Sequence, residues 1–223
     1  KGLDCLVTAI AELKSEGRPY PLVGMLFDVS AMQAVSGGNP PSLNDEGARR
    51  VFYGMIRDFF SRIPREFRAW TQTGKPRAGE LACIVFLENS RAVCDLGPEA
   101  VAYVNERFER DFGSLIVWIG DSSAAGIDGL DGYRVDAGSV SSAGSGIGRI
   151  RTVSVSAGHN DCAISEPDKA AIVSRMGGQT YADAWAKVLL DQPQWVFCDA
   201  WNNLLEGSAL CATREYGRKY IDA

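Results

Sequence analysis

Short apolar runs rich in Val, Ile and Phe alternate along this chain with longer segments of helical periodicity. This alternation is typical of βα units built around a parallel sheet. The predicted strands are residues 21–27, 81–87, 115–119, 133–135, 151–155 and 195–200. The predicted helices are residues 3–14, 45–63, 98–112, 181–190 and 212–221.

The strands are apolar along their whole length, which favours a sheet buried on both faces, as in a doubly wound fold or a (β/α)8 barrel. A chain of 223 residues that is 46% hydrophobic can bury such a core, and we expect one domain over residues 1–223. Six strands are two short of a barrel, and a helix precedes the first strand. We therefore expect an α/β fold, a (β/α)8 TIM barrel whose first βα elements would precede Lys1.

The segment 122–148 is rich in Gly, Ser and Ala and is too long for an ordinary βα loop. It is predicted to be either a mobile active-site loop or a decorated, poorly packed segment.

Charge and hydropathy exclude several classes of partner. A net charge of −5 without runs of like charge gives no electrostatic footprint for nucleic acid or for an anionic membrane. No stretch approaches the roughly 18 consecutive apolar residues of a membrane span. We expect a neutral small molecule or polymer as the partner and no cofactor, while the oligomeric state stays open.

The cysteines and the histidine give no metal signature. Six cysteines are scattered without metal-ligand spacing and His159 is the only histidine, so no metal site is expected. Cys83 and Cys198 lie in apolar runs and are predicted to be buried thiols, with a disulfide as the alternative. If the protein is secreted, two of Cys94, Cys162 and Cys211 are predicted to form a disulfide, and which two stays open.

Polar side chains gather at the ends of the predicted strands. They are Asp28, Glu88 and Asn89, Asp121, His159 to Asp161, and Asn202, Asn203 and Glu206. Since all strand ends of a barrel meet at one face, we expect these residues to line one cleft.

Carboxylates, amides and tryptophans suit a sugar, because the polar groups bond hydroxyls and an indole stacks on a pyranose. Glycoside hydrolysis needs a carboxylic acid for the leaving oxygen and usually a second carboxylate. Glu206 is the candidate acid, or alternatively it pins the following turn.

The other candidates keep structural alternatives as well. Asp28 and Asp121 bind substrate or cap the next turn. His159 is a proton shuttle or a structural hydrogen-bonding group. Trp118 and Trp201 are sugar platforms or core residues, and Asp199 is a candidate partner for Arg175.

The C-terminal segment Trp201-Asn-Asn-Leu-Leu-Glu206-Gly-Ser208, followed by Thr213-Arg-Glu-Tyr-Gly-Arg-Lys-Tyr220, resembles a motif of known enzymes. The motif has the form W-N-E-W-x-E-G-[ST], then [ST]-x-E-Y-G-x-x-Y, and belongs to endo-α-mannosidase and endo-α-mannanase-type glycoside hydrolases of families 99 and 71. Segments 20–28, 74–76, 156–161 and 175–185 are similar to the same group, so the resemblance spans nearly the whole chain.

This resemblance implies a barrel that cleaves or binds α-linked glycans without a metal, with Glu206 as general acid/base. The partner glutamate, which assists the sugar 2-hydroxyl, falls on Asn203, and the second tryptophan falls on Leu204. An amide bonds a hydroxyl but cannot accept its proton, so the family mechanism cannot run unchanged here. One alternative is that another carboxylate takes the role of the missing glutamate; the candidates are Asp28, Glu88, Asp121 and Asp161. The other alternative is that the site still binds sugar but no longer hydrolyses it.

We therefore expect a glycosidase-like domain acting on an α-linked glycan or polysaccharide, secreted or extracellular. The predicted catalytic residues are Glu206, Asp161 and Glu88. The predicted substrate-binding residues are Asp28, Asp121, His159, Trp201, Asn202 and Asn203. The alternatives are a carbohydrate-binding barrel without catalysis and a structural or assembly subunit that reuses the fold.

Overall fold

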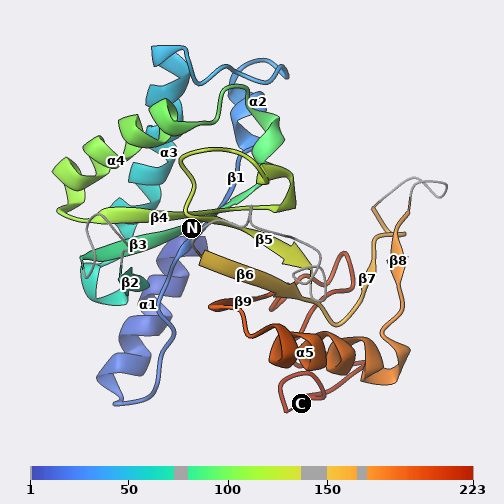
Figure 1. Cartoon of the computed structure of the whole chain (residues 1–223). Helices are drawn as coiled ribbons and strands as arrows, with labels where there is room; N and C mark the ends of the chain where they lie inside the picture. Colours follow the sequence, from blue (N-terminus) through green and yellow to red (C-terminus); the bar gives the residue numbers. More distant parts are fainter. Residues whose placement is uncertain (1, 73–79, 137–149, 165–169, 223) are drawn as a thin grey trace. The chain divides into compact units, whose positions relative to one another are not determined.

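The computed structural model describes residues 2–72, 80–136, 150–164 and 170–222 (Figure 1). The chain divides into two compact units, Lys1–Tyr133 and Arg134–Ala223, and each is described by itself. The prediction of one domain over residues 1–223 stays a prediction.

The first unit contains a parallel sheet with β3, Leu81–Glu88, at its centre. Strand β1, Met25–Asp28, and strand β4, Leu115–Gly120, both run parallel to β3, and β5, Gly132–Asp136, begins beside the end of β4. A short strand that the sequence did not predict, β2 at Trp70–Gln72, pairs antiparallel with the start of β3. Val85 and Leu87 of β3 are fully buried, as expected for a central strand.

Two helices cover one side of this sheet, α3 at Glu46–Arg62 and α4 at Pro98–Phe112 (Figure 1). In α3 the buried side chains Phe52, Ile56 and Phe60 recur every four residues and form one apolar stripe. They pack with Phe108 of α4 and with Trp118, which is 1% exposed and is therefore a core residue.

Local capping fixes where both helices begin and end. The Asp45 side chain accepts a hydrogen bond from the Ala48 N–H at 2.8 Å, which caps α3 as predicted. Helix α4 starts with Pro98 and is capped at its C-terminus by Gly113. Gly113 has a φ of 62°, a left-handed conformation that glycine adopts with little strain.

The remaining helices of the first unit are short or peripheral. Helix α1, Gly2–Ser15, buries Ile10 in a separate cluster with Val23, Ile63 and Phe67. The other elements are α2, Ala31–Val35, and the 3-10 turns η1, Arg65–Phe67, η2, Ser90–Ala92, and η3, Ser122–Ala124.

The second unit is a βαβ arrangement with an added hairpin (Figure 1). Strand β6, Ile150–Val155, and strand β9, Trp195–Cys198, pair in parallel, and α5, Gln179–Asp191, packs against β6 between them in sequence. A hairpin of β7, His159–Asn160, and β8, Ile172–Val173, follows β6, and η5, Met176–Gly178, precedes α5. The core joins Val153 and Val155 to Tyr181, Val188 and the C-terminal residues Leu210 and Tyr220.

Most predicted elements are confirmed, and three predictions need correction. The segment 212–221 is a series of turns and not a helix, because Thr213 and Gly217 exchange backbone hydrogen bonds and Gly217 has a φ of 55°. The predicted strand 21–27 is regular only from Met25, since Val23 makes a single bridge to Arg68. The predicted strand 195–200 ends at Cys198.

The predicted long loop 122–148 contains η3 and β5 in its first part, and its residues 137–149 lie outside the described residues. Of the two predicted buried thiols, Cys83 is buried, and burial raises its pKa to about 11. Cys198 is exposed because it is the last residue of β9. All six cysteines are free thiols.

Asp121 ties the end of β4 to the end of β3. Its carboxylate accepts hydrogen bonds from the Ser90 N–H at 3.0 Å, the Ser123 hydroxyl at 2.6 Å and the Ala124 N–H at 3.1 Å. Burial raises the pKa of Asp121, but these hydrogen bonds outweigh it, so the pKa lies below the ordinary value of 3.8. A lowered pKa in the folded state stabilises the fold above pH 3.8, and that contribution disappears as the pH falls through the folded-state pKa.

We predict that Asp121→Asn lowers the free energy of unfolding at pH 7 by about 1–3 kcal/mol, because one acceptor oxygen becomes a donor that faces another donor. The difference from the wild type should shrink as the pH falls below 3.8 towards the folded-state pKa, where the wild-type carboxylate also becomes protonated. Urea unfolding between pH 7 and pH 3 measures both effects. Asp128→Asn, an exposed position in the following loop, is the control and should leave stability unchanged at every pH. Equal stability of wild type and Asp121→Asn at pH 7 would contradict the assignment.

Candidate functional site

In the first unit, parallel pairing brings the carboxyl ends of the strands side by side. Asp28 and Glu88 are register partners at the ends of β1 and β3. The Asp28 Oδ1 accepts hydrogen bonds from the Asn89 amide at 3.0 Å and from the Ser30 N–H at 2.9 Å. Burial raises the pKa of Asp28, and the hydrogen bonds from Asn89 and Ser30 lower it by more, so it lies below its usual value.

A cavity of about 600 Å³ lies at these strand ends. Its walls include Glu88, Asn89 and Asp121, together with Arg91 and Ser123. Arg91 is fixed by a hydrogen bond of 2.9 Å from its Nε to the Ser123 carbonyl. Asp28 does not line this cavity, and its bond to Ser30 is the turn-capping contact that was the alternative for this residue. Asp121 makes capping contacts of the same kind, and the substrate-binding roles of both stay predictions.

In the second unit, the turn after β9 holds Glu206 through a reciprocal pair of hydrogen bonds. The Asn203 Nδ2 donates to the Glu206 Oε2 at 2.7 Å, and the Glu206 N–H donates to the Asn203 Oδ1 at 3.3 Å. The Ser208 N–H also donates to the Asn203 carbonyl at 3.1 Å. Gly207, with a φ of 61°, lets the chain reverse directly after Glu206. The two residues singled out by the C-terminal motif are therefore in direct contact.

The β7–β8 hairpin contacts the same turn. The Asn160 N–H donates to the Glu206 carbonyl at 2.7 Å, which places Asp161 one residue from that contact. The Asp161 Oδ1 accepts from the Ala171 N–H at 2.6 Å, and its Oδ2 lies 3.7 Å from the His159 Nε2. His159, Asp161, Asn203 and Glu206 thus belong to two adjoining segments of one unit.

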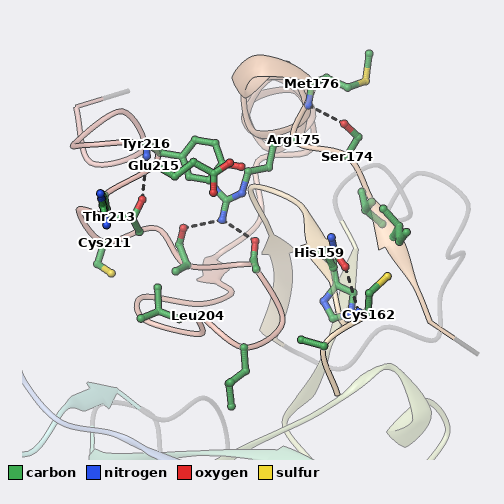
Figure 2. A pocket seen from close by; sticks show the side chains of 18 of the residues that line it. His159, Cys162, Ser174, Arg175, Met176, Leu204, Cys211, Thr213, Glu215 and Tyr216 are labelled. Carbon is green, nitrogen blue, oxygen red and sulfur yellow. Dashed lines mark hydrogen bonds between the residues drawn. The ribbon is translucent and has the colours of Figure 1, made fainter. Parts of the chain in front are cut away.

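Arg175, which follows β8, bonds the backbone that comes directly after Glu206 (Figure 2). Its Nη2 donates to the carbonyl oxygens of Gly207 at 2.6 Å and Ala209 at 2.9 Å. Its guanidinium lies 4.6 Å from the ring centre of Tyr216 and 4.5 Å from that of Tyr220. The predicted pairing of Arg175 with Asp199 is wrong, because the Nη2 of Arg175 bonds these two carbonyls and its Nη1 is buried without a hydrogen-bond partner among the described residues.

A cavity of about 1070 Å³ lies in the second unit, and Figure 2 shows part of its lining. Its walls include His159, Arg175, Leu204, Leu205 and Tyr216. Of the polar strand-end residues that were expected to line a cleft, His159 and Asn160 line this cavity; Glu206, Asp161 and residues 202–203 do not, and neither does Trp201. Trp201 is 61% exposed and is not a core residue, and Asn202 is also exposed.

The sequence missed the contacts of Arg175 and Arg91 because both are made with backbone carbonyls far away in the chain. The only available signal for Arg175 was its place in the segment that resembles known glycoside hydrolases. Among the described residues no group of three His, Cys, Asp or Glu is arranged to hold a metal ion. No helix in the described ranges is both long and apolar enough to cross a membrane.

Three solved structures with a similar fold are described as a glycoside hydrolase or as similar to one. The GH99 endo-alpha-mannosidase from Bacteroides thetaiotaomicron matches with a TM-score of 0.50 and 17% identity, over 74% of this chain and 51% of that chain. This chain therefore spans about half of that structure. A second structure of that name, in complex with bis-tris-propane, has a TM-score of 0.55 and 14% identity, over 95% of this chain and 74% of that one.

A structure described as a glycoside hydrolase-like protein has a TM-score of 0.60 and 12% identity, over 98% of this chain and 84% of that chain. At such identities the likeness shows the fold alone, which is a glycoside hydrolase-like α/β fold. The predicted fold class, with a parallel sheet that corresponds to part of a TIM barrel, is thereby confirmed. A comparison with curated proteins gives no match.

One family model covers the whole chain. It matches residues 1–223 and is described as a domain of unknown function, DUF5010. Because the match extends over the full length, the chain belongs to the DUF5010 family.

Proposed function

We propose that this chain is a glycoside hydrolase domain that acts on an α-linked glycan, with Glu206 as general acid/base. The observation that carries the proposal is the contact between Glu206 and Asn203 at the end of β9. In a fold of this kind, residues that follow the carboxyl ends of the strands carry the chemistry. The finer assignment, to the type of families 99 and 71, rests on the C-terminal motif.

Glu206 meets the geometric needs of an acid/base residue. Its backbone is held at both sides, since its N–H donates to Asn203 and its carbonyl accepts from Asn160. Its Oε2 accepts from the Asn203 amide, which leaves Oε1 to exchange a proton with the glycosidic oxygen and then with water. Asn203 orients this carboxylate and bonds a sugar hydroxyl, but it cannot serve as the second carboxylate.

We assign the second carboxylate to Asp161, while the predicted catalytic role of Glu88, which belongs to the first unit, stays a separate prediction. Asp161 belongs to the same unit as Glu206 and follows Asn160, which bonds the Glu206 carbonyl. Glu88 lines the cavity at the strand ends of the first unit. His159, Trp201 and Asn202 complete the proposed site of the second unit as substrate-binding residues, and substrate binding by Asp28 and Asp121 stays a prediction for the first unit. A polymeric glycan substrate fits an extracellular location, which is part of the proposal.

A second candidate function is glycan binding without hydrolysis. The observation that favours it is the amide of Asn203, which stands where the resembling motif has a glutamate and which bonds Glu206 through both its Nδ2 and its Oδ1. In that case the same residues recognise a glycan and no bond is cleaved.

We predict that Glu206→Gln lowers kcat on α-linked glycans at least about 100-fold, because the amide cannot transfer the proton that the leaving oxygen needs. Reducing ends released from a panel of α-linked mannans and glucans measure the effect. Glu12→Gln, an exposed change on α1, is the control and should keep full activity. Full activity of Glu206→Gln, in a protein with an unchanged melting temperature, would overturn the assignment.

Asn203→Glu distinguishes the two candidate functions. If Glu206 works with another carboxylate, the new charge beside its Oε2 removes a charge-assisted hydrogen bond, and we predict a loss in kcat of about tenfold or more at pH 7. Gln192→Glu, an exposed position at the end of α5, adds the same charge without this contact and should leave kcat unchanged. Hydrolysis that appears in Asn203→Glu and is missing in the wild type would contradict the proposed hydrolase and support the binding function.

A further inference from the structure

Arg175 connects several segments of the second unit that are far apart in sequence. It precedes η5, and its Nη2 reaches the carbonyls of Gly207 and Ala209, 32 and 34 residues further along. Its guanidinium contacts the ring of Tyr216 (Figure 2) and that of Tyr220 in the C-terminal turns. No predicted role accounts for these contacts.

The aliphatic part of the Arg175 side chain is also closely packed. A Cβ placed on Gly158 would lie 2.7 Å from the Arg175 Cγ and 2.8 Å from the Val173 carbonyl. Gly158 also has a φ of 139°, which side-chain-bearing residues rarely adopt. Glycine at this position therefore lets the Arg175 side chain pass between the end of β6 and the C-terminal turns.

The turn that carries Glu206 has few other restraints. Residues 201–208, all of which are described, form no helix or strand. Leu204 and Leu205 are 66% and 69% exposed, so apolar packing does not fix the turn. Its restraints are polar: the Leu210 and Cys211 N–H groups donate to the Trp201 carbonyl at its start, Asn160 donates to the Glu206 carbonyl, and Arg175 donates to the Gly207 carbonyl. The Arg175 bond acts on Gly207, the residue directly after Glu206.

We propose that Arg175 is the positioning residue for Glu206, and this inference rests on the proposed hydrolase function. The bonds from Nη2 to Gly207 and Ala209 hold the backbone that follows Glu206 against a guanidinium fixed by Tyr216 and Tyr220. Asn160 holds the Glu206 carbonyl, and Asn203 holds the carboxylate. With all three in place, the Glu206 side chain has a fixed direction before a substrate arrives, which is the condition for efficient proton transfer.

The geometry requires arginine and not simply a positive charge. A planar guanidinium contacts two tyrosine rings while one nitrogen donates to two carbonyls. A lysine ammonium has no plane to lie against the rings, and its more mobile stem would not fix the direction of both hydrogen bonds.

Arg175→Lys tests the proposal, with kinetics and amide hydrogen exchange measured on the same protein. We expect kcat to fall at least about tenfold while KM changes less than about threefold, since the carboxylate is misplaced and the substrate contacts remain. We expect the Ser208 and Asn160 amides to exchange at least about tenfold faster, while amides in the β6–β9 pair keep their rates. Arg218→Lys, an exposed residue that pairs with Asp222 in the same C-terminal turns, is the control and should change neither.

Unchanged kcat together with unchanged exchange of Ser208 and Asn160 would overturn the proposal. Exchange that rises equally in all of the second unit, with a parallel loss in melting temperature, would also overturn it, because it indicates a purely structural role. The exchange measurement needs no catalytic activity, so it is separate from the test of Glu206. Faster exchange at Ser208 and Asn160 with full activity of Glu206→Gln would leave the Arg175 contact in place and reject Glu206 as the acid/base residue.

Discussion

Parallel pairing of buried strands positions the polar residues in each unit of this protein. In the first unit the register of β1 on β3 puts Asp28 beside Glu88, and β4 brings Asp121 to the same edge. In the second unit β6 and β9 run in parallel, so the segments that follow them, with Asn160 and Glu206, leave the sheet at the same end. Apolar burial thus determines the strands, and their direction determines where the polar chemistry lies.

Hydrogen bonds to backbone groups, more than ion pairs, hold the residues at these strand ends. Asp121 accepts from the backbone of Ser90 and Ala124, and Arg175 donates to the carbonyls of Gly207 and Ala209. Such bonds give a partner to backbone N–H and C=O groups in loops, where no helix or sheet provides one. They also explain why the same residue can be structural and still belong to a functional site. Glu206 is an example, since its backbone pins the turn and its carboxylate is held by Asn203.

The regular parts of the fold were predictable from local signals in the sequence. Helix α4 begins at Pro98 and ends at Phe112 as predicted, because Pro98 and Gly113 act through short-range backbone preferences. The predicted helix 212–221 is wrong, although Tyr216 and Tyr220 are four residues apart, a spacing that also occurs on one face of a helix. In the structure the two tyrosines lie in successive turns, and both rings contact the guanidinium of Arg175.

The candidate site was predictable in its residues and not in its contacts. The C-terminal motif pointed to Asn203 and Glu206, and their direct bond agrees with that local spacing. The contacts of Arg175 depend on three segments folding against one another, so sequence spacing carried no sign of them. The residues predicted to line one cleft belong to two units. Asp28, Glu88 and Asp121 are in the first unit, and His159, Asp161 and Glu206 are in the second.

The central claim is that the Glu206 turn engages an α-linked glycan. NMR spectra of the ¹⁵N-labelled protein, titrated with an α-linked manno-oligosaccharide, test it most directly. The account predicts saturable shifts of the Asn203 side-chain amide and of backbone amides in residues 159–161 and 201–208, with no change in α4. Saturating sugar that leaves these signals unmoved, or that shifts only signals elsewhere, would contradict it.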